Sequence, residues 1–314
     1  MIDNQDQKRV AIILGFYNGN KYLIDQLDSI ISQTHNSKQI FIFNDNSSEK
    51  INLLNSYQNK KSNSIITTIN RKKNLGFAGN FLFGLRDVGS NFDYYAFSDQ
   101  DDIWEINKIE KALNQISKLD TFKPVLYCSR TAYYTEDCSK EIGESKYFKN
   151  KKGFKNALIQ NIAAGNTIVL NRSARDLVVE SLICDKYISH DWWCYQLITA
   201  AGGEVIYDKK KSVRYRQHRQ NLIGGNNRFR DKLQRLNSFI SGIFKSWIDV
   251  NISNLNNNRN LIKRDNLEIL DNFIKARDAK NPFKRLRFYF KAGAFRQSFI
   301  ENFVFIFGIF FNKI

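Results

Sequence analysis

The chain has 314 residues, and its hydrophobic share of 42% and aromatic share of 14% are enough for one large α/β domain with an appended region. Its formal net charge is +17, and residues 209–314 alone carry 23 Lys and Arg against 7 Asp and Glu. This basic region predicts an anionic partner, either nucleic acid or a membrane surface. The chain shows no signal-peptide core, no run of about 18 apolar residues and no CxxC zinc pattern, which excludes those classes and predicts a cytoplasmic protein.

Strands and helices alternate along the first third of the chain. Short apolar runs predict strands, and apolar residues at helical spacing predict helices. The strands are expected at 10–16, 39–43, 65–69 and 94–97, and the helices at 22–33, 51–58 and 79–86. This alternation favours a doubly wound, mostly parallel sheet of the α/β class.

The pattern is less regular further along. We expect helices at 104–119, 153–160, 173–181 and 190–201, strands at 126–130 and 204–207, and an extended segment at 213–218. From Asn227 onward the sequence becomes helical and basic up to its end. We therefore divide the chain into a nucleotide-binding and catalytic domain at 1–226 and a basic amphipathic helical region at 227–314.

Polar clusters follow three of the predicted strands, at 15–19, 44–48 and 98–102. In doubly wound sheets, ligands bind outside the carboxyl ends of the strands. The three clusters are therefore expected to meet on one rim of the sheet and to form a single binding site there.

Three carboxylates, Asp99, Asp101 and Asp102, crowd the end of the apolar strand that precedes them. They repel one another, so the fold alone gains nothing from them. A hard divalent cation such as Mg²⁺ or Mn²⁺ relieves the repulsion, and such a cation usually shares its remaining positions with phosphate oxygens. The cluster thus predicts a phosphate-bearing substrate, in the first place a nucleotide.

Five short motifs carry a resemblance to a known family. They are Phe16-Tyr17-Asn18-Gly19, Asn44-Asp45-Asn46-Ser47, Asn74-Leu75-Gly76, Ser98-Asp99-Gln100-Asp101-Asp102 and His190-Asp191-Trp192-Trp193. In this order they resemble the inverting glycosyltransferases of glycosyltransferase family 2. The run 98–104 and the closing Tyr215-Arg216-Gln217-His218 are similar to its rhamnosyltransferase-like branch. The resemblance covers about residues 8 to 226 and implies a GT-A fold, a nucleotide-sugar donor, a divalent metal and inversion at the anomeric carbon.

The resemblance also implies which residues bind the donor. These are Phe16, Tyr17, Asn18, Asp45, Asn74, Gly76, Asp99 and Arg216. Two of these assignments have structural alternatives. Asp45 is also suited to cap the helix predicted at 51–58, and 74–76 is also suited to an ordinary turn.

The residues that bind the metal, act as the general base and contact the acceptor are assigned in the same way. The resemblance implies Asp101 and His218 as metal ligands, although His218 is also compatible with an ordinary histidine. A single-displacement transfer needs one carboxylate to take the proton of the acceptor hydroxyl, and Asp191 is the candidate, with helix capping as its alternative. The residues expected to contact the acceptor are Gly165, Asn166, Trp192 and Trp193. One of the two tryptophans is more suited to the core.

The basic region at 227–314 is expected to lie on a membrane surface or to pack as helices on the catalytic domain or a second subunit. The run 299–311 is rich in Phe and Ile but is interrupted by Glu301 and Asn302. It is too short to span a bilayer and is typical of an in-plane helix. The predicted location is cytoplasmic and peripheral at the inner face of the cell membrane.

Three functions are considered for this sequence. The first is an inverting transferase that moves a sugar, in the first place rhamnose from dTDP-rhamnose and otherwise a hexose from a UDP-sugar, to a glycan or lipid-linked acceptor in cell-surface polysaccharide synthesis. A nucleic-acid binder is disfavoured, because no known motif is present and the acidic cluster would repel a phosphate backbone. A glycosidase needs two carboxylates that flank the bond, whereas this cluster is better suited to metal. Self-association, the acceptor and the linkage stay open.

Overall fold

The computed structural model describes residues 8–51, 65–120, 122–218 and 242–314. The helix predicted at 51–58, apart from Ile51, and the part of the basic region between 227 and 241 lie outside the described residues.

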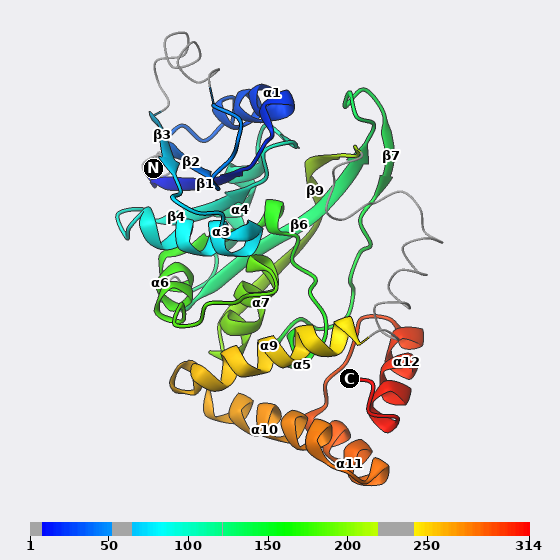
Figure 1. The fold of residues 1–314 in the computed structure, drawn as a ribbon. Helices are drawn as coiled ribbons and strands as arrows, with labels where there is room; N and C mark the ends of the chain where they lie inside the picture. Colours follow the sequence, from blue (N-terminus) through cyan, green and yellow to red (C-terminus); the bar gives the residue numbers. More distant parts are fainter. Residues whose placement is uncertain (1–7, 52–64, 121, 219–241) are drawn as a thin grey trace.

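The first half of the chain builds a parallel sheet. Strands β1 (Val10–Phe16), β2 (Lys38–Asn44), β3 (Ile65–Asn70) and β4 (Tyr94–Ser98) pair in the order β3-β2-β1-β4 (Figure 1). Helices α1 (Asn20–Ile31) and α3 (Gly76–Asp87) connect them. These elements confirm the alternation predicted from the sequence.

Both faces of this sheet are buried, as a doubly wound fold requires. Successive residues of β1 point to opposite faces, so Ile12 joins a core with α1 and α4 (Lys108–Ile116), while Ile13 joins a second core with α3 and the helices that follow. The near-continuous apolar sequence of β1 is explained by this two-sided burial.

The second half of the chain extends the sheet in mixed directions. Strand β8 (Val169–Asn171) runs antiparallel between β4 and β6 (Val125–Tyr134), and β9 (Glu204–Arg216) runs parallel to β6. Strands β5 (Ile103–Trp104) and β7 (Glu141–Glu144) add antiparallel pairs to β9 and β6. The sheet is therefore parallel in its first half, as predicted, and mixed beyond it.

Two boundaries differ from the sequence-based predictions. The helix predicted at 104–119 begins only at Lys108, because Ile103 and Trp104 pair with Arg214 and Val213 of β9 instead. The strand predicted at 204–207 and the extended segment predicted at 213–218 join into the one long strand β9. Both differences arise from pairing between segments far apart in the sequence, β5 with β9 and β6 with β9, which local patterns do not report.

Short helices complete the catalytic part. The helix predicted at 153–160 is reduced to α5 (Phe154–Ala157), and a single 3₁₀ turn, η2 (Gly165–Thr167), precedes β8. Helices α6 (Arg172–Glu180) and α7 (His190–Ala200) occur where they were predicted.

The basic region folds as α9 (Ile243–Asn257), η3 (Arg259–Leu261), α10 (Arg264–Asp278), α11 (Pro282–Ala292) and α12 (Phe299–Phe310) (Figure 1). Its buried residues, among them Leu255, Phe273 and Phe305, belong to the same hydrophobic cluster as Trp192 of α7. The helices thus pack against the catalytic part through a continuous core. Within the described ranges, no helix is long and apolar enough to cross a membrane.

Candidate active site

The acidic loop, residues 99–102, lies between β4 and β5, at the carboxyl end of β4. Burial disfavours the ionised carboxylate of Asp99, and the charges of Asp101 and Asp191 add to the effect, so its pKa rises to about 7. The fully buried Asp102 has its pKa raised well above its ordinary value, first by burial and then by Asp101 and Asp99. The crowding of carboxylates predicted from the sequence is confirmed, and Asp191 joins it from α7.

Asp102 is held by residues from two other elements. The side-chain amide of Asn166 in η2 donates to its Oδ2 over 2.6 Å, and the backbone N–H of Arg216 in β9 lies 3.4 Å from its Oδ1. Asn166, predicted as an acceptor contact, therefore lies directly against the acidic loop. A contact of Asn166 with the acceptor stays a prediction.

Lys108, at the start of α4, places a buried amine close to this loop. Its side chain is fully buried, its Nζ lies 3.3 Å from the centroid of the Trp104 ring, and it has no hydrogen-bond partner among the described residues. Burial lowers its pKa well below the ordinary value, while Asp102 and Asp99 oppose that change. Lys108 was not predicted as a site residue from the sequence, because a lysine in a helix is usually at the surface.

Asp101 is held by Arg216, at the end of β9, and by His218, two residues further along. His218 Nε2 lies 2.8 Å from Asp101 Oδ2, with both side chains largely buried. Arg216 Nε donates to the backbone oxygen of Asp101 over 2.9 Å, and its Nη2 donates to Asp25 Oδ2 over 2.9 Å. Arg216 stays a predicted donor contact, and these bonds also give it a structural role that the sequence did not indicate.

The pair of Asp101 and His218 fits a divalent cation. Its donor atoms, a carboxylate oxygen and an imidazole nitrogen, already face each other across a hydrogen bond. Within the described ranges, no group of three or more His, Cys, Asp or Glu side chains converges on one point. A cation held here would therefore take further ligands from phosphate oxygens, as Mg²⁺ commonly does.

The predicted donor residues of the second and third motifs come together in one loop pair. Asp45 Oδ1 accepts from the backbone N–H of Leu75 over 2.7 Å, and Asn74 Nδ2 donates to the backbone oxygen of Asp45 over 3.0 Å. Gly76 has φ 69°, a left-handed conformation that glycine adopts without strain. Asp45 is almost fully buried, and burial raises its pKa despite hydrogen bonds from Leu75 and Gly76. It thus caps α3, a helix other than the one considered from the sequence.

The first motif joins the same rim. Asn18 Oδ1 accepts from Ser47 Oγ over 2.7 Å and from the backbone N–H of Ser48 over 3.1 Å. The backbone N–H of Tyr17 donates to Gln100 Oε1 in the acidic loop over 2.8 Å, and the Tyr17 side chain is half exposed. The convergence of the three polar clusters on one rim is therefore confirmed.

Phe16 differs from the other predicted donor residues in its environment. Its ring is 1% exposed and packs in the core shared with α1, while its backbone oxygen accepts from the N–H of Asp45 over 2.9 Å. Only the backbone of Phe16 faces the rim residues, and a donor contact by its ring stays a prediction.

Asp191 lies in the first turn of α7. The N-cap side chain of that helix is Ser189, and Asp191 Oδ1 accepts from the backbone N–H of Trp192 over 2.7 Å. Gly165 lies close beside it, since a Cβ placed on Gly165 would come 3.5 Å from the Cβ of Asp191. Its carboxylate is close enough to Asp99 to raise the pKa of that residue. The candidate base and the acidic loop thus share one site.

His190, next to the candidate base, was not singled out from the sequence. Its ring is 4% exposed and packs between aromatic side chains, with centroids 4.2 Å from Phe81 and 4.9 Å from Phe97. Neither ring nitrogen has a partner among the described residues, and a Cβ on Gly165 would lie 2.4 Å from Nε2. Burial lowers the pKa of His190 to about 4, so the imidazole is neutral at pH 7.

Trp192 and Trp193 both lie in the hydrophobic core. Trp192 Nε1 donates to the backbone oxygen of Ala157 over 2.7 Å, and Trp193 Nε1 donates to Ser181 Oγ over 3.0 Å. Both indoles therefore have packing roles, as the sequence suggested for one of them, and a contact of either with an acceptor stays a prediction.

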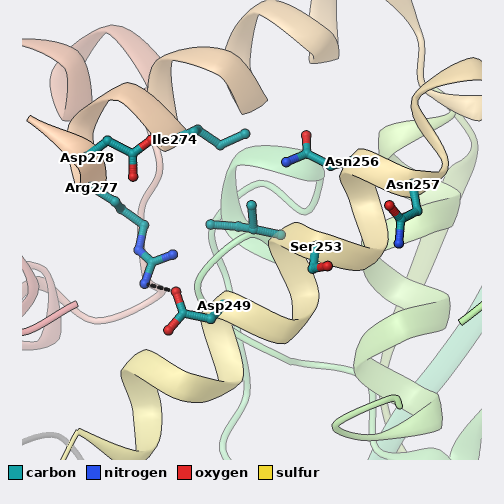
Figure 2. A pocket seen from close by; sticks show the side chains of 8 residues that line it. Asp249, Ser253, Asn256, Asn257, Ile274, Arg277 and Asp278 are labelled. Carbon is teal, nitrogen blue, oxygen red and sulfur yellow. Dashed lines mark hydrogen bonds and ion pairs between the residues drawn. The ribbon is translucent and has the colours of Figure 1, made fainter. Parts of the chain in front are cut away.

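A separate hollow of about 450 Å³ lies between α9 and α10 (Figure 2). Arg277 and Asp249 form an ion pair of 2.6 Å across it. None of the predicted site residues lines this hollow, so it is not the site described above. Its lining residues are Asp249, Ile252, Ser253, Asn256, Asn257, Ile274, Arg277 and Asp278.

The parallel βα units and the carboxylate-rich rim define an α/β enzyme for a phosphate-bearing substrate. The family model for glycosyl transferase family 2 matches residues 11–177, more than half of the chain, so the chain belongs to that family and is a glycosyltransferase. Both the fold class and the family expected from the sequence are confirmed.

The dTDP-rhamnosyl transferase RfbG of Shigella flexneri is 30% identical over 227 residues, which cover 70% of this chain and 76% of that protein. Two solved structures share the fold. TarS 1-349 of S. aureus in complex with UDP-GlcNAc has a TM-score of 0.57 at 13% identity, covering 90% of this chain and 81% of the other. The mannosyltransferase PcManGT of Pyrobaculum calidifontis in complex with GDP-Man and Mn²⁺ has a TM-score of 0.52 at 12% identity, covering 91% and 86%.

Proposed function

We propose that this glycosyltransferase moves rhamnose from dTDP-rhamnose to a glycan or lipid-linked acceptor in cell-surface polysaccharide synthesis, with inversion at the anomeric carbon. The observation that supports this type of reaction is the convergence on one rim of Asp99, Asp101, Asp191 and His218. The choice of donor is supported by the similarity to a dTDP-rhamnosyl transferase over 70% of the chain.

In this proposal the site residues divide the work of one displacement. Asp191 takes the proton of the acceptor hydroxyl as its oxygen attacks the anomeric carbon. The bond between that carbon and the phosphate oxygen breaks, and the nucleoside diphosphate leaves with the bonding electrons. Mg²⁺ or Mn²⁺, bound by Asp101 and His218, would supply a Lewis acid that neutralises the diphosphate.

The rim loops supply the donor contacts in the same proposal. Hydrogen bonds already join Asp45, Asn74 and Gly76 at the start of α3. After β1, Asn18 bonds Ser47 and Tyr17 bonds Gln100, which holds the first motif on the same rim. Asp99 is proposed to contact the donor from the acidic loop. The buried amine of Lys108 lies close enough to Asp99 and Asp102 for their charges to oppose the lowering of its pKa by burial.

The test is donor binding, measured by thermal shift and calorimetry with dTDP-, UDP- and GDP-sugars, each with Mn²⁺ and with EDTA. We expect stabilisation by dTDP-rhamnose that requires the metal, and we expect Asp101→Ala to lose it. Asp265→Ala, which removes an exposed carboxylate of α10, is the matched control. Preference for UDP-sugars would instead favour hexosyl transfer, and the absence of any nucleotide response would contradict the proposal.

The second test separates binding from chemistry. Asp191→Asn keeps the size of the side chain and an oxygen that accepts from the N–H of Trp192, but it cannot take a proton. We expect donor affinity to be unchanged and the rate of transfer to fall by about 10² to 10⁴, the usual contribution of a general base. Near-normal turnover in a radiolabelled-sugar transfer assay would remove Asp191 from the mechanism.

We further propose that the enzyme works as a peripheral protein at the cytoplasmic face of an anionic membrane. Helix α11 supports this with exposed aromatic side chains beside exposed Lys and Arg side chains, and α12 adds further exposed aromatic side chains, a pattern typical of membrane-surface helices. Self-association through the same surface is the alternative, and light scattering without lipid would detect it. The exposed aromatic residues are Phe283, Phe290, Phe299, Phe303, Phe307 and Phe311.

A further inference from the structure

Tyr22, in the first turn of α1, contacts two side chains that come from the end of β9. The guanidinium carbon of Arg216 lies 4.4 Å from the centroid of the Tyr22 ring. The imidazole centroid of His218 lies 5.0 Å from the same centroid, with the two planes tilted by 34°. Tyr22 is 8% exposed, so its ring is enclosed by these neighbours and the core.

Both of these side chains hold Asp101. His218 bonds the carboxylate, with 2.8 Å between Nε2 and Oδ2, and Arg216 donates from Nε to the backbone oxygen of Asp101 over 2.9 Å. One contact orients the side chain and the other fixes the backbone. The Tyr22 ring is therefore a shared support for the two groups that place Asp101.

The ring itself is anchored. Tyr22 Oη donates to Glu136 Oε1 over 2.6 Å, and Arg216 Nη1 donates to the backbone oxygen of Glu136. The turn that contains Glu136 follows β6, so three elements far apart in the sequence meet around Tyr22. A side chain held from several directions in this way loses little freedom when a ligand binds to its neighbours.

We propose that Tyr22 is a positioning residue that holds Asp101 and His218 at the spacing a divalent cation needs, an inference that rests on the proposed function of this pair. Residues outside the ligand shell orient metal ligands, and their loss typically weakens metal binding or activity by about 10- to 100-fold. Tyr22 acts here mainly through packing and a cation–π contact with Arg216, and its hydroxyl bond to Glu136 serves to hold the ring in place.

Two substitutions test the role of the ring. Tyr22→Leu removes the aromatic face, and Tyr22→Phe keeps it while losing the bond to Glu136. We expect Mn²⁺ affinity of the dTDP-bound full chain, measured by electron paramagnetic resonance of free Mn²⁺, to fall about tenfold or more in Tyr22→Leu. Tyr22→Phe is expected to restore most of that affinity. Tyr289→Leu, which removes a buried tyrosine ring from α11, controls for general loss of stability.

The outcomes separate this inference from the proposed function. If the wild-type chain binds Mn²⁺ with dTDP but Tyr22→Leu binds it equally well, the positioning role is wrong and the proposed metal site stands. If the wild-type chain itself binds no Mn²⁺ with nucleotide, both are wrong. An equal loss in Tyr22→Phe and Tyr22→Leu would assign the effect to the Glu136 bond and overturn the role of the ring.

A second variant covers the case in which the leucine protein does not fold. Tyr22→Met keeps an unbranched apolar side chain of greater length, and it is expected to show the same loss of Mn²⁺ affinity. When either Tyr22 variant is combined with His218→Ala, it should add little to the loss of Mn²⁺ affinity that His218→Ala causes alone, because Tyr22 acts partly through His218. Full additivity of the two losses would contradict the proposal.

Discussion

At the scale of single residues, the site combines groups whose charge is controlled by burial. Asp99 and Asp102 have raised pKa values because burial and neighbouring carboxylates disfavour their ionised forms, and Lys108 has a lowered pKa because it is buried without a hydrogen-bond partner in the described part of the chain. His190 is neutral for the same reason and packs as an aromatic ring against Phe81. Burial thus favours the neutral forms of these acidic and basic groups, which lie close to the rim where a charged donor is proposed to bind.

His190 makes the protein sensitive to acid. Its pKa is about 4 in the folded chain, below the value of about 6.5 expected in the unfolded chain, so protons bind the unfolded state more tightly. The stability that results is present above pH 6.5 and is lost as the pH falls toward 4. At pH 5 we expect the loss to be about 2 kcal/mol.

The check compares the wild-type chain with His190→Phe, which keeps an aromatic ring but cannot be protonated. The free energy of unfolding in urea, measured from pH 7 to pH 5, is expected to fall less in the variant by about 2 kcal/mol. Because both proteins share all other titratable groups, including the adjacent Asp191, the difference isolates His190. Identical pH profiles would show that the imidazole is not held in its neutral form.

At the scale of elements, the site is made by loops that bond to one another and not only to their own strands. Asn18 after β1 accepts from the residues after β2, and Asp45 after β2 accepts from the start of α3. Gln100 after β4 bonds the backbone of Tyr17 in both directions. The rim therefore behaves as one hydrogen-bonded unit at the carboxyl ends of β1, β2 and β4.

Substitutions of Asp45 test whether the rim loops depend on one another. Asp45→Ala leaves the N–H group of Leu75 without its acceptor, and we expect a loss of about 1 to 3 kcal/mol in the free energy of unfolding together with weaker nucleotide binding. Asp45→Asn keeps an acceptor oxygen and should recover most of the stability. Urea denaturation measures the first quantity and calorimetry the second. Unchanged stability in Asp45→Ala would show that α3 does not depend on this cap.

At the scale of the whole molecule, charge and apolar surface are divided unevenly. The first 208 residues are close to neutral, and residues 209–314 carry nearly all of the net charge of +17. Helix α12 has three exposed phenylalanines, Phe299 (76% exposed), Phe303 (49%) and Phe307 (61%). They recur at every fourth position, so they lie on one side of the helix. Phe305 and Ile309 face the core instead. Helix α12 therefore presents an outward aromatic face that the rest of the described chain leaves uncovered.

This face predicts binding to anionic lipid. We expect sedimentation of the full chain with vesicles of phosphatidylcholine and phosphatidylglycerol, and weaker sedimentation with phosphatidylcholine alone or at high salt. Replacing Phe299, Phe303 and Phe307 together by Ser should weaken vesicle binding by about tenfold or more, because each ring contributes apolar area that would be buried in the interface.

Phe122→Ser is the matched control, since Phe122 is 91% exposed but lies in the loop before β6 rather than in the basic helices. Its vesicle binding should equal that of the wild-type chain. Equal binding by the triple variant would contradict a lipid role for α12, and light scattering of both proteins would then ask whether the face joins two copies of the chain.

The sequence by itself determined the parallel half of the sheet, the rim and its acidic loop. Apolar runs such as Val10–Phe16 predict buried strands because both faces of a doubly wound sheet are covered, and the polar residues after each strand predict the rim. The five motifs added the family, which the family model confirms. These features depend on residues close together in the chain, where periodicity and composition carry the information.

Only the tertiary structure decided which groups meet. Trp104 pairs in β5 rather than opening a helix, Lys108 is buried above its ring, and Tyr22 supports Arg216 and His218 across almost two hundred residues of sequence. No local pattern reports such contacts, because a lysine or a tyrosine in an amphipathic helix has the same periodicity whether its neighbour in space is solvent or a carboxylate. The burial that shifts the pKa values of Asp99 and His190 likewise exists only once distant strands and helices have packed together.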